Sequence, residues 1–326
     1  MIARRRVLVG LALAAGSGAP SFGHDRPKII GALTPYSTAE NELAREIFNR
    51  AMLELNYVNG KQFSVVERLA DGKNERLPEL AQDLVKLKVD LILASTTNAA
   101  AAARDATTSI PIVFFDVSDP VRAGFVESLG RPGRNMTGVS NFSGDLNAKR
   151  LELLKQIVPG LTRVAVLMNR TNPYFSLGQI ERVKAPAEQL GLLALPVYAS
   201  SLEELERAFQ SMTQQRAQAV LVAPDVYFWI ERNRIARLAL SLRIPSMFAF
   251  AEYVEAGGLM SYGVDTREGL IRAASYVTKI FSGAKPADLP VEQPTKVSLV
   301  VNRATARAMN LNIPKVLLLQ AEKVVG

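Results

Sequence analysis

Residues 90–115, DLILASTTNAAAAARDATTSIPIVFF, contain the pattern that decides the fold. Residues 90–94 form a short, strongly apolar run, residues 98–107 are alanine-rich and helical in character, and residues 112–115 form a second apolar run. Such short apolar runs are typical of strands that a parallel sheet buries on both faces. Their alternation with helices indicates an α/β protein with helices covering both faces of the sheet.

The alternation continues on both sides of this stretch and occurs twice along the chain. On the N-terminal side we expect strands at 28–33 and 62–68 and helices at 38–56 and 74–88. On the C-terminal side the pattern predicts strands at 136–140, 163–168, 193–198, 219–222 and 246–250, and helices at 145–158, 173–190, 201–214 and 227–242. The residues therefore predict two successive α/β units of similar size.

The C-terminal part of the chain is expected to return to both units. It contains a short strand, a helix, a proline-rich extended segment and a last strand, at 259–262, 267–281, 282–294 and 297–301. We therefore expect two Rossmann-like lobes, each a mostly parallel sheet with helices on both faces. Residues 27–139 plus 264–288 would form the first lobe, and residues 140–263 plus 289–326 the second.

The composition excludes several classes of protein. The chain of 326 residues has no cysteine, which excludes disulfides, a cysteine nucleophile, a thiolate metal site and a lipid-anchored cysteine. Its one histidine, His24, lies near the N-terminus, so the fold cannot hold a Ser-His-Asp triad or a multi-histidine metal site. The net charge of +8 is not gathered into a basic cluster with interleaved aromatic residues, so we expect no nucleic-acid partner.

The first 23 residues are predicted to be a cleaved export signal. Arg4, Arg5 and Arg6 precede an apolar run at 7–15, and small, turn-forming residues follow up to Gly23. The apolar run is too short to cross a bilayer, and paired arginines fit a twin-arginine signal as well as the ordinary Sec route. The mature protein is expected in the periplasm without a lipid anchor.

Polar side chains follow most of the expected strands. Because ligands of open parallel sheets bind beyond the carboxyl ends of strands, these positions are candidates for ligand contact. They carry hydroxyls, amides and carboxylates, which can hold a small polar molecule but lack the base and nucleophile needed to transform one. Each could also simply cap a helix. The candidates are Tyr36, Ser95, Thr96, Thr97, Asn98, Ser118, Asp119, Ser140, Asn169, Asn172 and Asp225.

Two other features have weaker chemical meaning. Asp116 and Asp119 could form a catalytic carboxylate pair, but Asp119 precedes a proline, which is typical of a turn. Trp229 opens an expected helix together with Tyr227 and Phe228. Packing in the core is the default interpretation of these aromatic side chains, although one of them could line a cleft and stack on a ligand.

The chain resembles the substrate-binding proteins of ABC transporters, in particular the tryptophan/tyrosine-type binding proteins with a type I periplasmic-binding-protein fold. The resemblance covers essentially the whole chain after the export signal. Its most specific blocks are IPIVF at 110–114, SDPV at 118–121, SLGRPGRNMTG at 128–138, GAKPADLPVE at 283–292, and Asn302 with the alanine-rich helix after it.

This resemblance implies two lobes joined by about three crossing strands, with the ligand held between them by hinge closure and delivered to a membrane permease. Position by position, it implies ligand contacts from residues 95–98, 118 and 119 in the first lobe and from Ser140, Asn169, Asn172 and Asp225 in the second. The chain departs from many relatives at Ser95-Thr96-Thr97-Asn98 and lacks an amide after Asp225. These departures leave open a ligand other than an aromatic amino acid, and the expected ligand is an amino acid or a related small carboxylate or aromatic compound.

We expect a monomeric solute-binding component of an uptake transporter, without catalytic activity, cofactor or metal. Two alternatives remain at this stage. An exported α/β enzyme would need a nucleophile or a cofactor motif, and the sequence contains no P-loop and no G-x-G-x-x-G after its first strand. A ligand-sensing partner of a membrane receptor would use the same two-lobed clamp, and the sequence does not separate it from a transport component.

Overall fold

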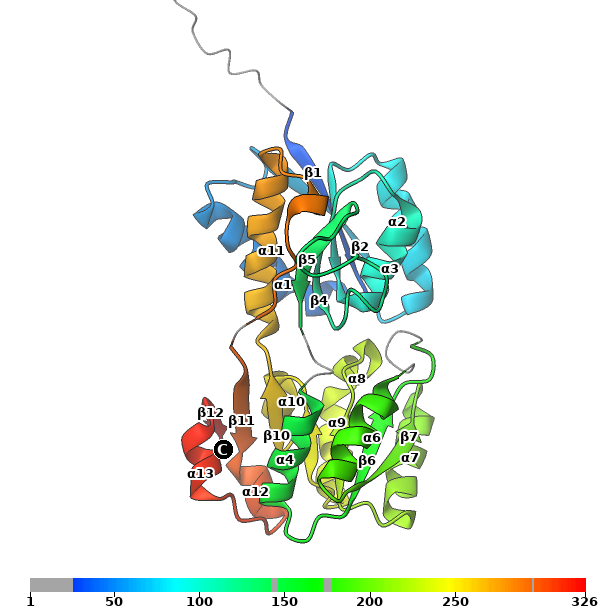
Figure 1. The fold of residues 1–326 in the computed structure, drawn as a ribbon, viewed down its shortest axis with the longest axis vertical. Coiled ribbons are helices and arrows are strands. Elements are labelled where there is room, and N and C mark those ends of the chain that lie inside the picture. The colour runs from blue at the N-terminus through cyan, green and yellow to red at the C-terminus, as the bar shows by residue number, and fades with distance from the viewer. Residues whose placement is uncertain (1–25, 142–145, 173–177, 295) are drawn as a thin grey trace, which may run out of the picture.

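Two α/β lobes lie one above the other in the computed structural model of the chain (Figure 1). The structure describes residues 26–141, 146–172, 178–294 and 296–326. The expected export signal, residues 1–23, lies outside the described residues. In the part of the chain that is described, no helix is both long and apolar enough to cross a membrane.

The first lobe contains a five-stranded sheet with the order β2-β1-β3-β4-β5. Every neighbouring pair in this sheet is parallel, so all five strands end at the same edge. The strands are rich in β-branched and aliphatic residues, as sheets buried on both faces require. They are β1 (Lys28–Thr34), β2 (Phe63–Leu69), β3 (Leu91–Ser95), β4 (Ile112–Val117) and β5 (Met136–Ser140).

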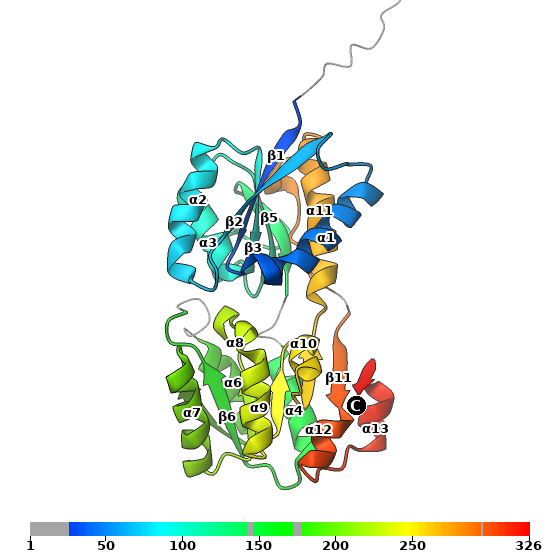
Figure 2. The same ribbon diagram turned by 180° about the vertical axis from the view of Figure 1, so that it is seen from behind.

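Two pairs of helices cover the two faces of this sheet (Figure 2). On one face, α1 (Thr38–Glu54) and α11 (Thr266–Phe281) bury Phe48 and Tyr276 against the strands. On the other face, the short turn η1 (Asn74–Arg76) leads into α2 (Leu77–Lys86), and α2 packs beside α3 (Thr96–Ala106). The alanines of α3 are nearly all buried, which lets this helix approach the sheet closely.

The second lobe contains a seven-stranded sheet with the order β12-β11-β10-β9-β8-β6-β7. Its strands are parallel except where β10 meets β11. β11 runs the other way because the chain re-enters this lobe from the first one. The strands are β6 (Arg163–Met168), β7 (Leu193–Tyr198), β8 (Ala219–Val222), β9 (Ser246–Phe248), β10 (Met260–Gly263), β11 (Ser298–Asn302) and β12 (Lys323–Val325).

Helices also cover both faces of the second sheet, and each face has its own apolar cluster. Side chains alternate between the two clusters along each strand, for example Val166 and Leu167 in β6. One face carries α4 (Asn147–Ile157), α6 (Gln179–Gln189), α12 (Arg303–Ala308) and α13 (Lys315–Gln320). The other carries α7 (Leu202–Gln214), α8 (Val226–Ile230), α9 (Arg232–Ser241) and α10 (Ala251–Glu255).

The chain passes between the lobes three times: after β5, after β10 and before β11 (Figure 1). The last passage lies later in the chain than the expected boundary after residue 288. The short turn η2 (Pro286–Asp288) is followed by residues that still bond to β5. Thr137 donates a hydrogen bond of 2.6 Å to the carbonyl of Leu289. Beside Val139, the backbone N–H of Glu292 donates to the carbonyl of Gly138, and the carbonyl of Glu292 accepts from the N–H of Ser140. These bonds hold residues 289–292 on the first lobe.

Several helices differ from those expected from the sequence. The helix expected at 227–242 is two helices, because the backbone leaves helical values at Glu231, where ψ is 14°. The helix expected at 74–88 begins with a tighter turn, and α10, α13 and β12 were not expected at all. These three elements have three to six residues each, too few to show a hydrophobic period.

Gly138 in β5 gives a testable prediction for the fold. Its φ is +151°, and a Cβ at this position would lie 1.9 Å from the carbonyl oxygen of Phe114 in β4. Gly138→Ala is therefore expected to lower the free energy of unfolding by about 1–3 kcal/mol or more, as overpacking of a core does. Gly130→Ala is the matched control, since its Cβ would meet no atom within 4 Å. Equal urea midpoints for the two variants would contradict this account of β4 and β5.

Candidate functional site

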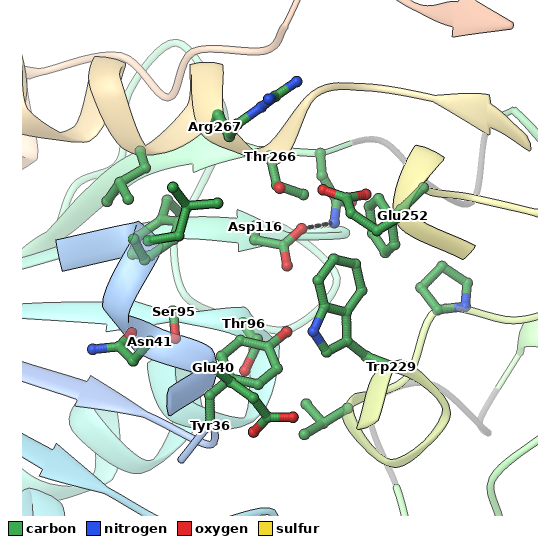
Figure 3. Close-up of a pocket in the computed structure, with 18 of the residues that line it drawn as sticks. Tyr36, Glu40, Asn41, Ser95, Thr96, Asp116, Trp229, Glu252, Thr266 and Arg267 are labelled. Carbon is green, nitrogen blue, oxygen red and sulfur yellow. Dashed lines mark hydrogen bonds between the residues drawn. The ribbon is translucent and has the colours of Figure 1, made fainter. Parts of the chain in front are cut away.

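A cavity of about 240 Å³ lies between the two lobes (Figure 3). Its walls include the segments that follow the carboxyl ends of strands in both sheets, as expected for parallel sheets. Residues of α1, α8, α10 and α11 complete the lining. The lining residues are Tyr36, Glu40, Asn41, Leu43, Ala44, Ile47, Ser95, Thr96, Phe115, Asp116, Asn141, Pro224, Asp225, Val226, Trp229, Phe250, Ala251, Glu252, Glu255, Thr266, Arg267 and Leu270.

The N-terminus of α3 forms one wall of the cavity. Ser95 and Thr96 are 5% and 6% exposed, and their hydroxyl oxygens are buried without a hydrogen-bond partner. Thr96 has a φ of +71°, which is rare and costly for a β-branched residue. The first backbone N–H groups of a helix lack intrahelical partners and carry a partial positive charge. This wall therefore offers hydroxyl and amide donors to an anionic group.

Asp116 enters the cavity from a β-bulge. The register between β4 and β5 shifts between Phe114 and Val117, and Asp116 within this shift has a φ of +57°. The amide of Asn141 donates a hydrogen bond of 2.6 Å to Oδ1 of Asp116. Burial nevertheless raises the pKa of Asp116 to about 7, and the nearby charge of Glu252 acts in the same direction.

Asp225 supports the second lobe's side of the cavity. It is 7% exposed and caps α8, accepting a hydrogen bond of 2.9 Å from the backbone of Tyr227. The side-chain amides of Asn169 and Asn172 donate to its two oxygens at 3.0 and 2.8 Å. Burial raises the pKa of Asp225, and these bonds oppose the rise. The two asparagines therefore orient Asp225 from behind.

Aromatic side chains form the apolar part of the cavity. The rings of Tyr36 in the first lobe and Trp229 in the second lie 6.3 Å apart, so they meet across the gap. Edge contacts with Phe250 and Tyr253, at 5.8 and 6.0 Å, fix the indole of Trp229. The arrangement can receive a flat or branched apolar group and shield it from water.

The eleven residues expected to contact a ligand fall into three groups in the structure. Tyr36, Ser95, Thr96 and Asp225 line the cavity. Asn169 and Asn172 lie behind it and bind Asp225. The cavity lining does not include Thr97, Asn98, Ser118, Asp119 or Ser140.

Some of the residues outside the cavity have other structural roles. The hydroxyl of Thr97 accepts a hydrogen bond from the backbone of Ser118, and Ser140 donates to the carbonyl of Ser118 at 3.2 Å. Both bonds fasten the loops after β3, β4 and β5 to one another. Asp119 forms an ion pair with Arg182 of α6, which joins the two lobes at their edge.

Sequence reasoning did not select several residues of the cavity wall. Asn141 directly follows the candidate Ser140, and Asp116 lies two residues before the candidate Ser118, so both belong to strand ends that the sequence indicated. For Trp229, packing in the core was the default interpretation and lining a cleft the alternative, and the structure places it in the cavity lining. Glu252 follows the expected strand at 246–250. The argument that ligands bind beyond the carboxyl ends of strands would therefore have selected it as well. Glu40 and Arg267 come from helices, and no sequence signal distinguishes them from surface charges.

Asp116 gives a pH-dependent prediction for stability. Its pKa of about 7 in the folded protein exceeds its ordinary value, so between about pH 4 and 7 the folded state holds a proton that the unfolded state releases. The contribution of Asp116 to stability is therefore lost as the pH rises through this window. Asn141, Glu252 and Tyr36 face Asp116, and none of them supplies a positive charge. We expect Asp116→Asn to raise the Tm at about pH 8 and to change it much less at about pH 5.

The control for this measurement is Asp83→Asn, which removes a half-exposed carboxylate on α2. Its effect on the Tm should be small at both pH values, because exposed ion pairs contribute about 0–1 kcal/mol. A Tm difference for Asp116→Asn that is the same at both pH values would contradict the assigned titration.

Comparison with known proteins relates this cavity to binding proteins. A tyrosine-binding protein from Clostridioides difficile (strain R20291) is 27% identical over 269 residues, which cover 82% of this chain and 76% of the relative. The solved ABC domain in complex with L-Trp from Streptococcus pneumonia has a TM-score of 0.85 at 26% identity, over 92% of this chain and all of that one.

A ligand-free, open structure of a substrate-binding protein with adhesive properties from Clostridium difficile fits less closely. Its TM-score is 0.69, also at 26% identity, over 91% of this chain and 99% of that one. The fold expected from the sequence, two mostly parallel α/β lobes of the type I periplasmic-binding-protein kind, is confirmed. The family model for ABC transporter substrate binding proteins matches residues 35–325, and the chain therefore belongs to this family of solute-binding proteins.

Proposed function

We propose that the protein binds an amino acid with an aromatic or bulky apolar side chain in the cavity between its lobes. The observation that supports this most directly is the pair of buried, unpartnered hydroxyls of Ser95 and Thr96 at the N-terminus of α3, which face the cavity opposite an aromatic wall. A ligand that satisfies these groups needs a polar head and an apolar body.

The α-carboxylate of the ligand is assigned to the N-terminus of α3. Buried hydroxyls without partners are costly, so a bound acceptor would stabilise the protein. The free backbone N–H groups and dipole of this eleven-residue helix favour an anion at the same place. The backbone strain at Thr96 is consistent with a position shaped for contact with a ligand.

The side chain of the ligand is assigned to the wall formed by Tyr36, Trp229 and Phe250. The leucine, isoleucine and phenylalanine side chains that α1, β4 and α11 contribute extend this apolar surface. Two relatives, the tyrosine-binding protein and the domain solved with L-Trp, have names or titles that specify aromatic amino acids. Their ligands support the same class for this chain.

Closure of the lobes is the proposed working motion. The Tyr36–Trp229 contact and the Asp119–Arg182 ion pair both join one lobe to the other, so both would be broken in an open form. The higher TM-score with the ligand complex than with the open structure supports a closed arrangement. A ligand that touches both walls stabilises the closed form by its differential affinity.

The biological setting is part of the proposal. We assign the protein to the periplasm, exported by its N-terminal segment, where it would deliver the ligand to a membrane permease. Catalysis is not part of the proposed function. Asp225 bonds to two side-chain amides and a helix end, and Asp116 bonds to an amide rather than to a nucleophile.

Thr96→Val tests the carboxylate site. The variant keeps the shape of the side chain but removes the hydroxyl, so we expect affinity for L-tryptophan or L-tyrosine to fall roughly tenfold, as for loss of a hydrogen bond to a charged group. Calorimetric titration of protein freed of co-purified ligand by unfolding and refolding would measure it. Thr213→Val, at an exposed position of α7, is the control. A native protein that gives no heat with any of the twenty amino acids would contradict the proposed function.

Asp119→Asn tests closure without altering the cavity wall. Loss of the ion pair with Arg182 should destabilise the closed form by up to about 1 kcal/mol, which corresponds to a fewfold loss of affinity. Small-angle scattering should show a smaller radius of gyration with saturating ligand for both proteins. An unchanged radius on ligand binding would argue against a hinged clamp.

A further inference from the structure

The charges that line the cavity are unbalanced. Five lining residues carry carboxylates, whereas Arg267 is the single lysine or arginine among the described residues of the lining. The guanidinium of Arg267 is held by both oxygens of Asp265 through hydrogen bonds of 2.7–3.0 Å. Arg267 therefore brings little uncompensated positive charge into the cavity, and the wall as a whole favours a cation.

Three of the five carboxylates already have partners. Glu40 accepts hydrogen bonds from the backbone and hydroxyl of Ser37 in the capping box of α1. Glu255 forms an ion pair of 2.6 Å with Lys323. Asp225 receives three hydrogen bonds of 2.8–3.0 Å from neutral donors. None of the three needs a ligand to satisfy its oxygens.

Asp116 and Glu252 are the two that remain. Within the described part of the chain, Asp116 receives one side-chain hydrogen bond, from Asn141 to Oδ1, so Oδ2 keeps its acceptor capacity. Among the described residues, Glu252 forms no ion pair and no hydrogen bond with another side chain. Burial raises its pKa, and only its own backbone N–H and the charge of the Asp265-bound Arg267 oppose the rise. Asp116 belongs to the first lobe and Glu252 to the second, and both lie in the same part of the cavity, beside Trp229 (Figure 3).

These two carboxylates line the cavity and do not form a cluster on the outer surface. The same cavity contains the buried, unpartnered hydroxyls of Ser95 and Thr96, which independently indicate a missing ligand. The indole of Trp229 and the ring of Phe250 line the same cavity, which adds apolar surface beside the two carboxylates. Attraction between a carboxylate and a cation is stronger beside such a surface than in bulk water.

We infer that the cavity recognises its ligand mainly through a cationic amino group held jointly by Asp116 of one lobe and Glu252 of the other. This inference rests on the proposed function and names the group that dominates affinity. Without a cation the two carboxylates repel each other as the lobes approach. A single ammonium between them satisfies both, so it favours the closed form as well as binding.

The inference predicts the order of affinity of three ligands that share an indole ring. L-tryptophan has an ammonium and a carboxylate, tryptamine has only the ammonium, and indole-3-propanoate has only the carboxylate. We expect tryptamine to bind at least about tenfold more tightly than indole-3-propanoate, because the latter leaves both acids unneutralised. Calorimetric titration of the native, ligand-depleted protein measures this order directly and needs no variant.

Two isosteric variants locate the effect. Asp116→Asn and Glu252→Gln should each weaken L-tryptophan and tryptamine by about tenfold or more and leave indole-3-propanoate unchanged or bound more tightly. Glu206→Gln, which removes an exposed carboxylate on α7, should change none of the three affinities. Thermal unfolding of each variant checks that it is folded.

The outcomes separate the two proposals. Binding of L-tryptophan with equal or tighter binding of indole-3-propanoate than of tryptamine would overturn the cation inference and leave the proposed function standing. Unchanged affinities in both Asp116→Asn and Glu252→Gln would do the same. Failure of the native protein to bind any amino acid would remove both.

Discussion

The carboxyl ends of the parallel strands in both lobes face one gap, and the rest of the site depends on this constraint. Parallel strands end at the same edge of a sheet, so the loops after β1, β3 and β4 must meet, as must those after β8 and β9. Helices that follow such strands begin at that edge and aim their free N–H groups into the gap. The chain then passes three times between lobes and keeps the two edges opposed.

Two aspartates on this edge, Asp225 and Asp116, have different hydrogen-bonding environments. Asp225 is surrounded by neutral donors from Asn169, Asn172 and the start of α8, which replace the water it loses. Such a carboxylate is structural, because its oxygens are satisfied without a ligand. Asp116 receives one amide and sits on a strained bulge, so its charge is poorly compensated. A carboxyl group of this kind raises its pKa, and a perturbed carboxyl group in a cavity is a candidate for contact with a ligand.

Much of the fold could be predicted from the sequence, because the hydrophobic period and the length of each segment distinguish helices from strands. The apolar runs at 90–94 and 112–115 alternate with an alanine-rich helix. Both lobes repeat this alternation over helices and strands long enough to show a hydrophobic period. The site was less predictable. The polar residues after β3 and β8 were found because Ser, Thr and Asp mark helix starts, but Asp116 depends on a bulge, and its positive φ has no signature in a residue other than glycine. Glu252 lies on a helix of five residues, which shows no periodicity.

The passage from β10 to α11 connects the hinge to the cavity. Gly263 ends β10 so close to Ala249 that a Cβ would lie 1.8 Å from its carbonyl oxygen. The buried guanidinium of Arg150 donates to the carbonyl of Tyr262 at 2.8 Å, which ties α4 to the same strand end. If the lobes rotate as proposed, this passage would bend beyond Gly263. Asp265, two residues on, caps α11 and bonds to Arg267 in the cavity wall, so the segment proposed to bend is directly linked to the cavity.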